Sequence, residues 1–319
     1  MLTATGAAQR RLHERAAAIR DRVFDRSVVV RGVVEVTNLC RVNCDYCPMR
    51  RDNTRRNSVY LLEPEQILSA ARAVRDAGVN AIVFQGGEIP QTTRVIADVL
   101  PRVRALFDDN VEVLLGLGVK SEAEYQTLRD RGANTYIIKH ETSDVELHRR
   151  SRQEELEVRL GAIRTLLRLG YRVGSGCIVG LPGQTVESVA DDILLAQSLG
   201  VHMCSASPFV PAADTPLANA ERGSTSLTLN AIAAMRIVNP QWLIPSVSAL
   251  EQQAAGGQRA GLRAGANVIT VNFTPADQQR QYLIYGHRRH IVAPDGVREQ
   301  LATVGLVPRQ SLWAGAGID

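Results

Sequence analysis

The pattern of apolar positions alternates along the chain between short runs typical of buried strands and longer stretches with helical spacing. The predicted strands cover residues 28–36, 80–85, 111–115, 134–138, 172–179, 201–206, 242–246 and 266–271. The predicted helices between them cover residues 64–77, 91–107, 121–131, 154–169, 185–199, 227–238 and 251–264. Pro64 and Gly170 are typical helix start and stop signals. Alternating strands and helices predict a parallel α/β fold, and eight such units predict a (βα)8 TIM-type barrel.

Both ends of the chain extend beyond the predicted barrel. Residues 7–26 are rich in Arg and Ala at helical spacing, which indicates a helix packed outside the barrel. No linker, low-complexity tract or short repeat interrupts the chain. We therefore expect one domain over residues 1–319, with an N-terminal helical extension (1–27), the barrel (28–286) and a C-terminal tail (287–319) that folds back on it.

Composition fits one large globular enzyme, because 45% of the 319 residues are hydrophobic and 22% are charged. The apolar runs are too short to cross a bilayer, and the N-terminus lacks a signal-peptide core, so we predict a cytoplasmic protein without membrane contact. The net charge of +4 is mild, and the arginines are scattered over amphipathic segments. Solvated helix faces explain them more simply than a nucleic-acid partner does.

Three of the five cysteines, Cys40, Cys44 and Cys47, form a C-x3-C-x2-C motif just after the first predicted strand. An odd, sparse set of cysteines argues against a disulfide framework and favours a reducing compartment. Structural zinc needs four ligands, and no His or further Cys lies nearby. Three thiolates suit a 4Fe–4S cluster with one iron open to a small molecule, although a zinc loop or incidental cysteines remain alternatives. Cys177 and Cys204 sit in apolar runs, and we interpret both as structural.

Polar and glycine residues follow several of the predicted strands, where the loops of a parallel barrel converge around ligands. Adjacent glycines allow the backbone to approach a ligand, charged residues offer partners for polar groups, and apolar Ile and Val suit an adenine ring. Ordinary turns and surface charges are the alternative reading. The residues of interest are Gly86, Gly87, Glu88, Glu141, Arg159, Ile178 and Val179. The glycine-rich segment 174–183 lacks the Gly-Lys-Ser/Thr ending of a phosphate loop.

These motifs, in this order, resemble the radical S-adenosylmethionine (SAM) superfamily. The resemblance is to its biotin synthase-like branch, first to the maturases of iron-iron hydrogenase and next to methylornithine synthases. It rests on segments 37–53, 85–88, 139–142, 179–185, 214–219, 265–269 and 272–275, and it extends over residues 30 to 285.

The resemblance implies cofactors and site residues. The three cysteines would bind one 4Fe–4S cluster whose open iron chelates SAM, and reductive cleavage would give methionine and a 5′-deoxyadenosyl radical. The residues implied to contact SAM are Tyr46, Gly86, Gly87, Glu88, Glu141, Arg159, Ile178 and Val179. Tyr282 and Tyr285 match tyrosines near the reaction centre, and residues 245–248 match the segment that holds the polar part of the substrate. With Thr270 and Asn272, the residues Ser246, Ser248, Tyr282 and Tyr285 are the expected substrate contacts.

Two departures from the maturase pattern concern the substrate. Val247 and Ser248 stand where the maturases have two threonines, and Gln278 replaces the first of three tyrosines. No late cysteine cluster follows, so a second cluster and sulfur insertion of the biotin synthase kind are not supported.

The sequence therefore predicts a radical SAM enzyme that acts on a small, amino-acid-derived substrate and receives electrons from a donor such as flavodoxin or ferredoxin. A maturase-like reaction on an organometallic precursor is favoured by similarity. Rearrangement or fragmentation of an amino acid carbon skeleton is the alternative. A non-catalytic barrel that serves as a binding partner is a remote third.

Overall fold

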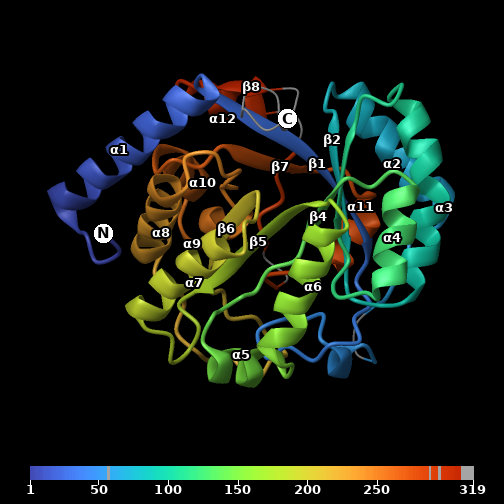
Figure 1. Ribbon diagram of the computed structural model, residues 1–319, viewed down its shortest axis with the longest axis horizontal. Coiled ribbons are helices and arrows are strands. Elements are labelled where there is room, and N and C mark those ends of the chain that lie inside the picture. The colour runs from blue at the N-terminus through green and yellow to red at the C-terminus, as the bar shows by residue number, and fades with distance from the viewer. Residues whose placement is uncertain (56–57, 287–288, 294–295, 310–319) are drawn as a thin grey trace.

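The computed structural model describes residues 1–55, 58–286, 289–293 and 296–309, and in it parallel strands curl into a barrel-like sheet with helices outside (Figure 1). The strands are β1 (Ser27–Thr37), β2 (Ala81–Gly86), β3 (Glu112–Gly116), β4 (Thr135–Ile137), β5 (Arg172–Val179), β6 (Met203–Pro208), β7 (Val268–Asn272) and β8 (Val307–Arg309). Their order is β6-β5-β4-β3-β2-β1-β7, with β8 beside β1, and all these pairs are parallel. The expected parallel α/β class is confirmed.

All seven predicted inter-strand helical regions form helices, and shorter helices appear that the apolar pattern did not predict. The helices are α1 (Gly6–Phe24), α2 (Pro64–Asp76), α3 (Gln91–Leu106), α4 (Glu122–Asp130), α5 (Val145–Arg152), α6 (Leu156–Arg168), α7 (Val186–Ser198), α8 (Thr225–Val238), α9 (Ser248–Gln253), α10 (Gly257–Arg263), α11 (Ala276–Gln281) and α12 (Val297–Ala302), and a 3-10 turn covers Arg51–Asn53. The predicted helix over 251–264 is two helices, because Gly256 adopts a left-handed conformation (φ 80°) between α9 and α10.

The predicted strand over residues 242–246 is not a regular strand. This segment lies between β6 and β7, where isolated parallel bridges pair Leu243 with Met203 and Pro245 with Val268. Two side chains interrupt the ladder: Asn267 Oδ1 accepts from the Ile244 N–H at 2.8 Å, and Pro245 has no N–H to donate. The segment thus occupies the place of the seventh barrel strand without a full ladder.

The alternation of side chains along β1 explains how this strand serves both the core and the interior. Val28, Val34 and Val36 belong to the core under the helices, whereas Val29 and Val33 belong to the smaller interior cluster. Gly32 lies between them, and a Cβ there would come within 2.8 Å of Val74 on α2. Arg31 and Glu35 point to the same side of β1 as Val29 and Val33. Two charged side chains therefore face the interior of the barrel.

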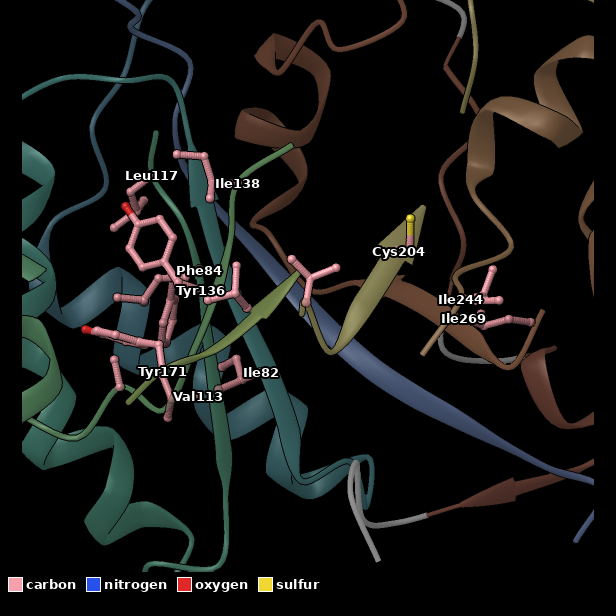
Figure 2. Packing of buried hydrophobic residues seen from close by; sticks show 14 of the residues in the cluster. Ile82, Phe84, Val113, Leu117, Tyr136, Ile138, Tyr171, Cys204, Ile244 and Ile269 are labelled. Carbon is pink, nitrogen blue, oxygen red and sulfur yellow. The ribbon is translucent and has the colours of Figure 1, made fainter. Parts of the chain in front are cut away.

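The layer between strands and helices is continuous and apolar. Figure 2 shows Ile82, Phe84 and Val113 packed with Tyr136 and Tyr171. Tyr136 and Tyr171 meet edge to face with ring centroids 5.9 Å apart. Cys204 and Cys177 are fully buried in this same cluster, in agreement with their expected structural role.

The two ends of the described chain lie on the outside of the barrel. Helix α1 runs along α8, and Gln9 on α1 donates a hydrogen bond to Asn230 on α8. Strand β8 pairs with the start of β1, so this part of the tail returns to the first strand. Residues 287–288, 294–295 and 310–319 of the predicted tail lie outside the described residues, and the domain boundaries stay a prediction. None of the described helices is long and apolar enough to cross a membrane.

Candidate functional site

A cavity of about 280 Å³ lies at the C-terminal ends of β2 to β6, and we call it the outer cavity. The cysteine loop that follows β1 forms one wall, and residues 282–285 form another. Because parallel strands direct their following loops to the same edge, motifs far apart in sequence meet here.

The cysteine loop is held in place by its neighbours. Cys40, Cys44 and Cys47 all line the outer cavity. The Glu88 amide N–H points at the Cys40 Sγ at 3.4 Å, and Arg152 Nη1 lies 3.3 Å from the Cys44 Sγ. Burial raises the pKa of the Cys44 thiol to about 11 and also raises the pKa of Cys40 and Cys47. The thiolate forms therefore need a positive partner such as a metal cluster.

The donor set fits a cluster better than a single ion. Among the described residues, no three His, Cys, Asp or Glu side chains converge closely enough to hold one metal ion. In a 4Fe–4S cube each thiolate binds a different iron, so three sulfurs around a shared cavity are the arrangement expected. The cysteine residues are thus suited to hold such a cluster at the cavity wall.

Glu88 is a buried carboxylate contacted by three arginines, of which Arg152 and Arg159 are buried and Arg41 is exposed. Its carboxylate is 4% exposed and lies 2.6 Å from Arg41, 3.3 Å from Arg152 and 3.8 Å from Arg159. Arg159 on α6 also approaches Glu154, yet its Nε is buried without a hydrogen-bond acceptor among the described residues. Arg159 therefore has a donor available for an acidic group of a ligand in the outer cavity.

Gly86 and Gly87 both line the outer cavity at the end of β2. A Cβ on Gly87 would lie 1.9 Å from the Leu39 carbonyl oxygen and 3.0 Å from the Cys40 Cβ. Only glycine allows this strand end to pack so closely against the cysteine loop. This packing makes Gly87 a support of the cysteine loop as well as a cavity residue.

Glu141 follows β4 with a left-handed backbone (φ 67°), which is unusual for a non-glycine residue. Its amide and carbonyl bond to Gly176 and Ile178 on β5, which hold it there. Lys139 Nζ is 3.0 Å from Glu141 Oε2, although this oxygen has no hydrogen bond among the described residues. Glu141 and Lys139 both line the outer cavity.

Asp192 on α7 supports the loops on this side from behind. Its side chain is fully buried and accepts hydrogen bonds from the Ser143 amide and from Gln184. Gln184 in turn donates to the Ile178 carbonyl. Burial raises the Asp192 pKa to about 6, whereas burial lowers the pKa of neighbouring His140 to about 4.

The apolar wall of the outer cavity contains Tyr46 and Ile178, which pack together with Phe209. Val179 does not line the cavity, contrary to the sequence prediction. Successive residues of β5 point to opposite faces, so Val179 is fully buried in the core under the helices while Ile178 faces the interior.

A second cavity of about 150 Å³, which we call the inner chamber, adjoins the outer cavity and shares Gln85, Ile284 and Tyr285 with it. Ser246, Ser248, Thr270 and Asn272 line the inner chamber, not the outer cavity. The structure thus brings together the expected substrate contacts from the strand-seven and strand-eight regions.

The two tyrosines differ in position. Tyr282 lines only the outer cavity, whereas Tyr285 lines both cavities, and its hydroxyl is 3.2 Å from Ser207 Oγ.

Three charged residues at these cavities were missed by sequence reasoning as ligand contacts. Arg152 sits on α5, which carries no clear apolar stripe. Lys139 was visible at a strand end but was given no role. Arg31 interrupts an apolar strand, a signal that could have marked it as an interior charge.

Comparison with known proteins agrees with this geometry. The radical SAM superfamily matches residues 34–196. The [FeFe] hydrogenase maturase subunit HydE of Thermotoga maritima is 38% identical over 276 residues, which are 86% of this chain and 78% of that protein. The 3-methylornithine synthase of Methanosarcina barkeri is 26% identical over 84% of this chain and 76% of its own length.

Solved structures share the fold. Methylornithine synthase PylB superposes with a TM-score of 0.86 at 24% identity, over 99% of this chain and 94% of its own. The hydrogenase maturase HydG of Carboxydothermus hydrogenoformans superposes with a TM-score of 0.77 at 20% identity, over 98% of this chain and 74% of its own. The predicted resemblance is confirmed, and so are the cofactors that it implies, a 4Fe–4S cluster and SAM. The chain belongs to the radical SAM superfamily and is an enzyme of that class.

Proposed function

We propose that this enzyme cleaves SAM in the outer cavity and acts on a small, amino-acid-derived substrate in the assembly of an organometallic cofactor. The observation that carries the proposal is the meeting of three cysteines, a glutamate-centred arginine cluster and an apolar wall around one cavity. When bound, the cluster supplies the electron that converts SAM to methionine and a 5′-deoxyadenosyl radical.

The residues of the outer cavity have complementary roles in this proposal. Arg159 donates to the SAM carboxylate through its Nε, which lies 3.5 Å from Glu154 but makes no hydrogen bond within the described residues. Glu88 and Glu141 accept hydrogen bonds from the amino group and the ribose. Ile178 and Tyr46 contact the adenine ring with their apolar surfaces. Together these contacts orient SAM against the cysteine loop.

The inner chamber and the tyrosines hold the substrate. Tyr285 lines both cavities, so it can contact a substrate that extends from the inner chamber toward SAM. Buried Tyr282, Met49 and Leu283 cover the cysteine side and exclude water from the radical. A reductant such as flavodoxin or ferredoxin supplies electrons.

The 38% identity to the maturase over most of both chains supports the maturase-like reaction. The second candidate is rearrangement or fragmentation of an amino acid, as in methylornithine synthase. It is favoured by the changed residues Val247 and Ser248, which line the inner chamber where the substrate would sit.

The first experiment tests radical SAM activity. Anaerobically reconstituted protein with dithionite and SAM is expected to form 5′-deoxyadenosine, and the Cys40→Ala variant is expected to form none. Absence of 5′-deoxyadenosine from cluster-loaded wild type would instead support the non-catalytic barrel.

A second experiment separates the two reaction types. In an in vitro maturation assay with an apo-[FeFe] hydrogenase and the remaining maturases, the maturase-like reaction predicts hydrogen evolution that depends on this protein. Substrate-dependent loss of a free amino acid with formation of an isomer, without maturation, would favour the alternative.

A further inference from the structure

The outer side of the cysteine loop carries an open hollow of about 590 Å³, separate from the two cavities described above. Among the described residues, Cys40 is the one that lines both this hollow and the outer cavity. The hollow therefore lies behind Cys40 as seen from the cavity beside which the cluster would be held. At this place the cluster would approach the protein surface through Cys40.

The rim of this hollow is positively charged. Arg41, Arg51 and Arg55 line it, no described Asp or Glu does, and all three arginines are exposed. Arg41 pairs with Glu88, but this carboxylate is buried and is shared with two further arginines. Arg51 pairs with its exposed neighbour Asp52 at 3.3 Å, and Arg55 has no ion pair within the described parts of the chain. The surface therefore presents more positive than negative charge to solvent.

Three half-buried apolar side chains, Leu39, Leu61 and Ile89, line the same hollow. We call these side chains, together with the three arginines of the rim, the arginine face. Apolar contact area bordered by charged side chains is the usual arrangement of a protein–protein interface. A patch of so few residues suits a transient encounter, as between redox proteins, better than a permanent complex.

We propose that the arginine face is the docking surface for an acidic protein that carries single electrons. Each reductive cleavage of SAM consumes one electron, and a donor protein must bind close to the cluster to deliver it. Carboxylates of the carrier pair with the guanidinium forks, and the positive charge of the face raises the association rate. In the complex the carrier loses one electron, which passes to the cluster beside Cys40. This inference rests on the proposed function, because it names the partner that supplies electrons to that site.

The test measures carrier binding to anaerobically reconstituted protein by surface plasmon resonance under nitrogen, which gives both the affinity and the association rate. The probes are a bacterial flavodoxin and a bacterial ferredoxin, both acidic, and the basic protein cytochrome c. At least one acidic carrier is expected to bind wild type, and cytochrome c is not. The association rate of that carrier is expected to fall about ten-fold or more between about 20 and 200 mM salt, because ions screen the attraction.

The double variant Arg51→Glu with Arg55→Glu provides the decisive comparison. It is expected to weaken carrier binding about ten- to a hundred-fold, mainly through a slower association rate. Formation of 5′-deoxyadenosine with limiting reduced carrier should fall by a similar factor, whereas formation with dithionite, which needs no docking, should stay at the wild-type level.

The matched control is Arg11→Glu with Arg15→Glu, two exposed arginines on α1 that are also four residues apart. Both double variants change the net charge by the same amount. Helix α1 precedes β1 whereas the cysteine loop follows it, so the control lies at the opposite end of this strand (Figure 1). The control should retain the wild-type affinity and association rate.

The outcomes separate this inference from the proposed function. If neither acidic carrier binds wild type, or if the Arg51→Glu, Arg55→Glu variant binds as wild type does, the arginine face is not the docking surface. A change from dimer to monomer in this variant, seen by gel filtration of the protein alone, would make the face an interface between two copies and would also overturn the proposal. Absence of 5′-deoxyadenosine from wild type with dithionite would contradict the proposed function, whereas the binding comparison would still decide the role of the face.

Discussion

The outer cavity and the inner chamber share Tyr285, but they balance their charges differently. In the outer cavity, Glu88 contacts three arginines and Lys139 lies beside Glu141. In the inner chamber, Arg31 remains without a carboxylate among the described residues. Each acidic group of the two sites has a basic partner, whereas Arg31 of the inner chamber is bonded only to the neutral Thr270 among the described residues.

This difference predicts how each site responds to mutation. Removing one partner from the outer network leaves other buried charges uncompensated, so positioning of the cofactors should suffer. Removing Arg31 eliminates a charge that has no carboxylate partner among the described residues, so the free energy of unfolding should change little. The following experiments test this contrast.

The largest effect is expected from the cysteines. Each of Cys40→Ala, Cys44→Ala and Cys47→Ala should reduce the bound iron from about four per chain to near zero, because a 4Fe–4S cluster cannot be held by two thiolates. Iron and sulfide analysis of reconstituted protein checks this. Cys204→Ala, in the buried core, is the control and should keep the iron. About eight irons in wild type would reveal a second cluster and contradict the single-cluster prediction.

Arg159→Ala should weaken SAM binding about ten- to a hundred-fold while the iron content stays at the wild-type level, because a charge-assisted hydrogen bond contributes roughly 1.5–3 kcal/mol. Equilibrium dialysis with labelled SAM gives the affinity. Arg164→Ala on the same helix removes an exposed arginine paired with Glu157 and should leave the affinity unchanged. An unaltered SAM dissociation constant for Arg159→Ala would make Arg159 a structural residue.

Tyr285→Phe and Ser248→Ala should separate radical formation from product formation. Both should retain the cluster, SAM binding and slow 5′-deoxyadenosine formation, while the ratio of product to 5′-deoxyadenosine falls about ten-fold, because a misplaced substrate reacts less often. The ratio is measured by mass spectrometry once the substrate is known. Tyr171→Phe, whose hydroxyl bonds within the core, is the control. A wild-type ratio in both variants would place the substrate elsewhere.

The smallest effect concerns Asp192, which supports the outer cavity from behind. The pKa of Asp192 is about 6 in the folded protein and 3.8 in its ordinary state, so between these pH values the folded state holds a proton on Asp192 more tightly than the unfolded state does. The stability that Asp192 contributes is therefore lost as pH rises from about 4 through 6. Relative to Asp192→Asn, wild type should lose about 1–3 kcal/mol of unfolding free energy between pH 4.5 and pH 7.5.

Denaturant titrations of both proteins without the cluster, at the two pH values, provide this comparison. His140 titrates in the opposite direction, since burial lowers its pKa to about 4, and its Nε2 lies 3.8 Å from Asp192 Oδ1. Both proteins are therefore compared in a His140→Gln background, which removes its contribution. Equal pH dependence in both proteins would show that Asp192 is ionised throughout this range.

Prediction from sequence succeeded where the signal is local. The buried strands β1, β2 and β5 were predicted within about two residues, because fully buried parallel strands are nearly continuous apolar runs. It failed where a tertiary contact changes local structure. The segment 242–246 has the composition of a strand, but the Asn267 side chain takes one of its amide hydrogen bonds.

The candidate site also divides into residues that local sequence signals predicted and residues that only tertiary contacts placed. The cysteine motif, Gly86, Gly87, Glu88, Glu141 and Ile178 were all placed at the outer cavity, because strand ends in a parallel barrel converge. Val179 was expected to contact SAM but lies in the core under the helices, because an apolar run does not reveal which residues of β5 face the interior. Arg152 was missed because the buried face of α5 is mostly polar, with His148, Ser151 and Arg152 beside Leu147, and gives no periodic apolar signal.

The sequence by itself determined the class of protein, since the spacing of Cys40, Cys44 and Cys47 and the order of the motifs depend only on neighbouring residues and chain order. Only the tertiary structure decided which charges are compensated. Glu35 is neutralised by Arg289, 254 positions away, whereas Arg31, four residues before Glu35 on the same strand, is not. Coulomb interactions depend on distance in space and on burial, and neither can be read from the order of residues along the chain.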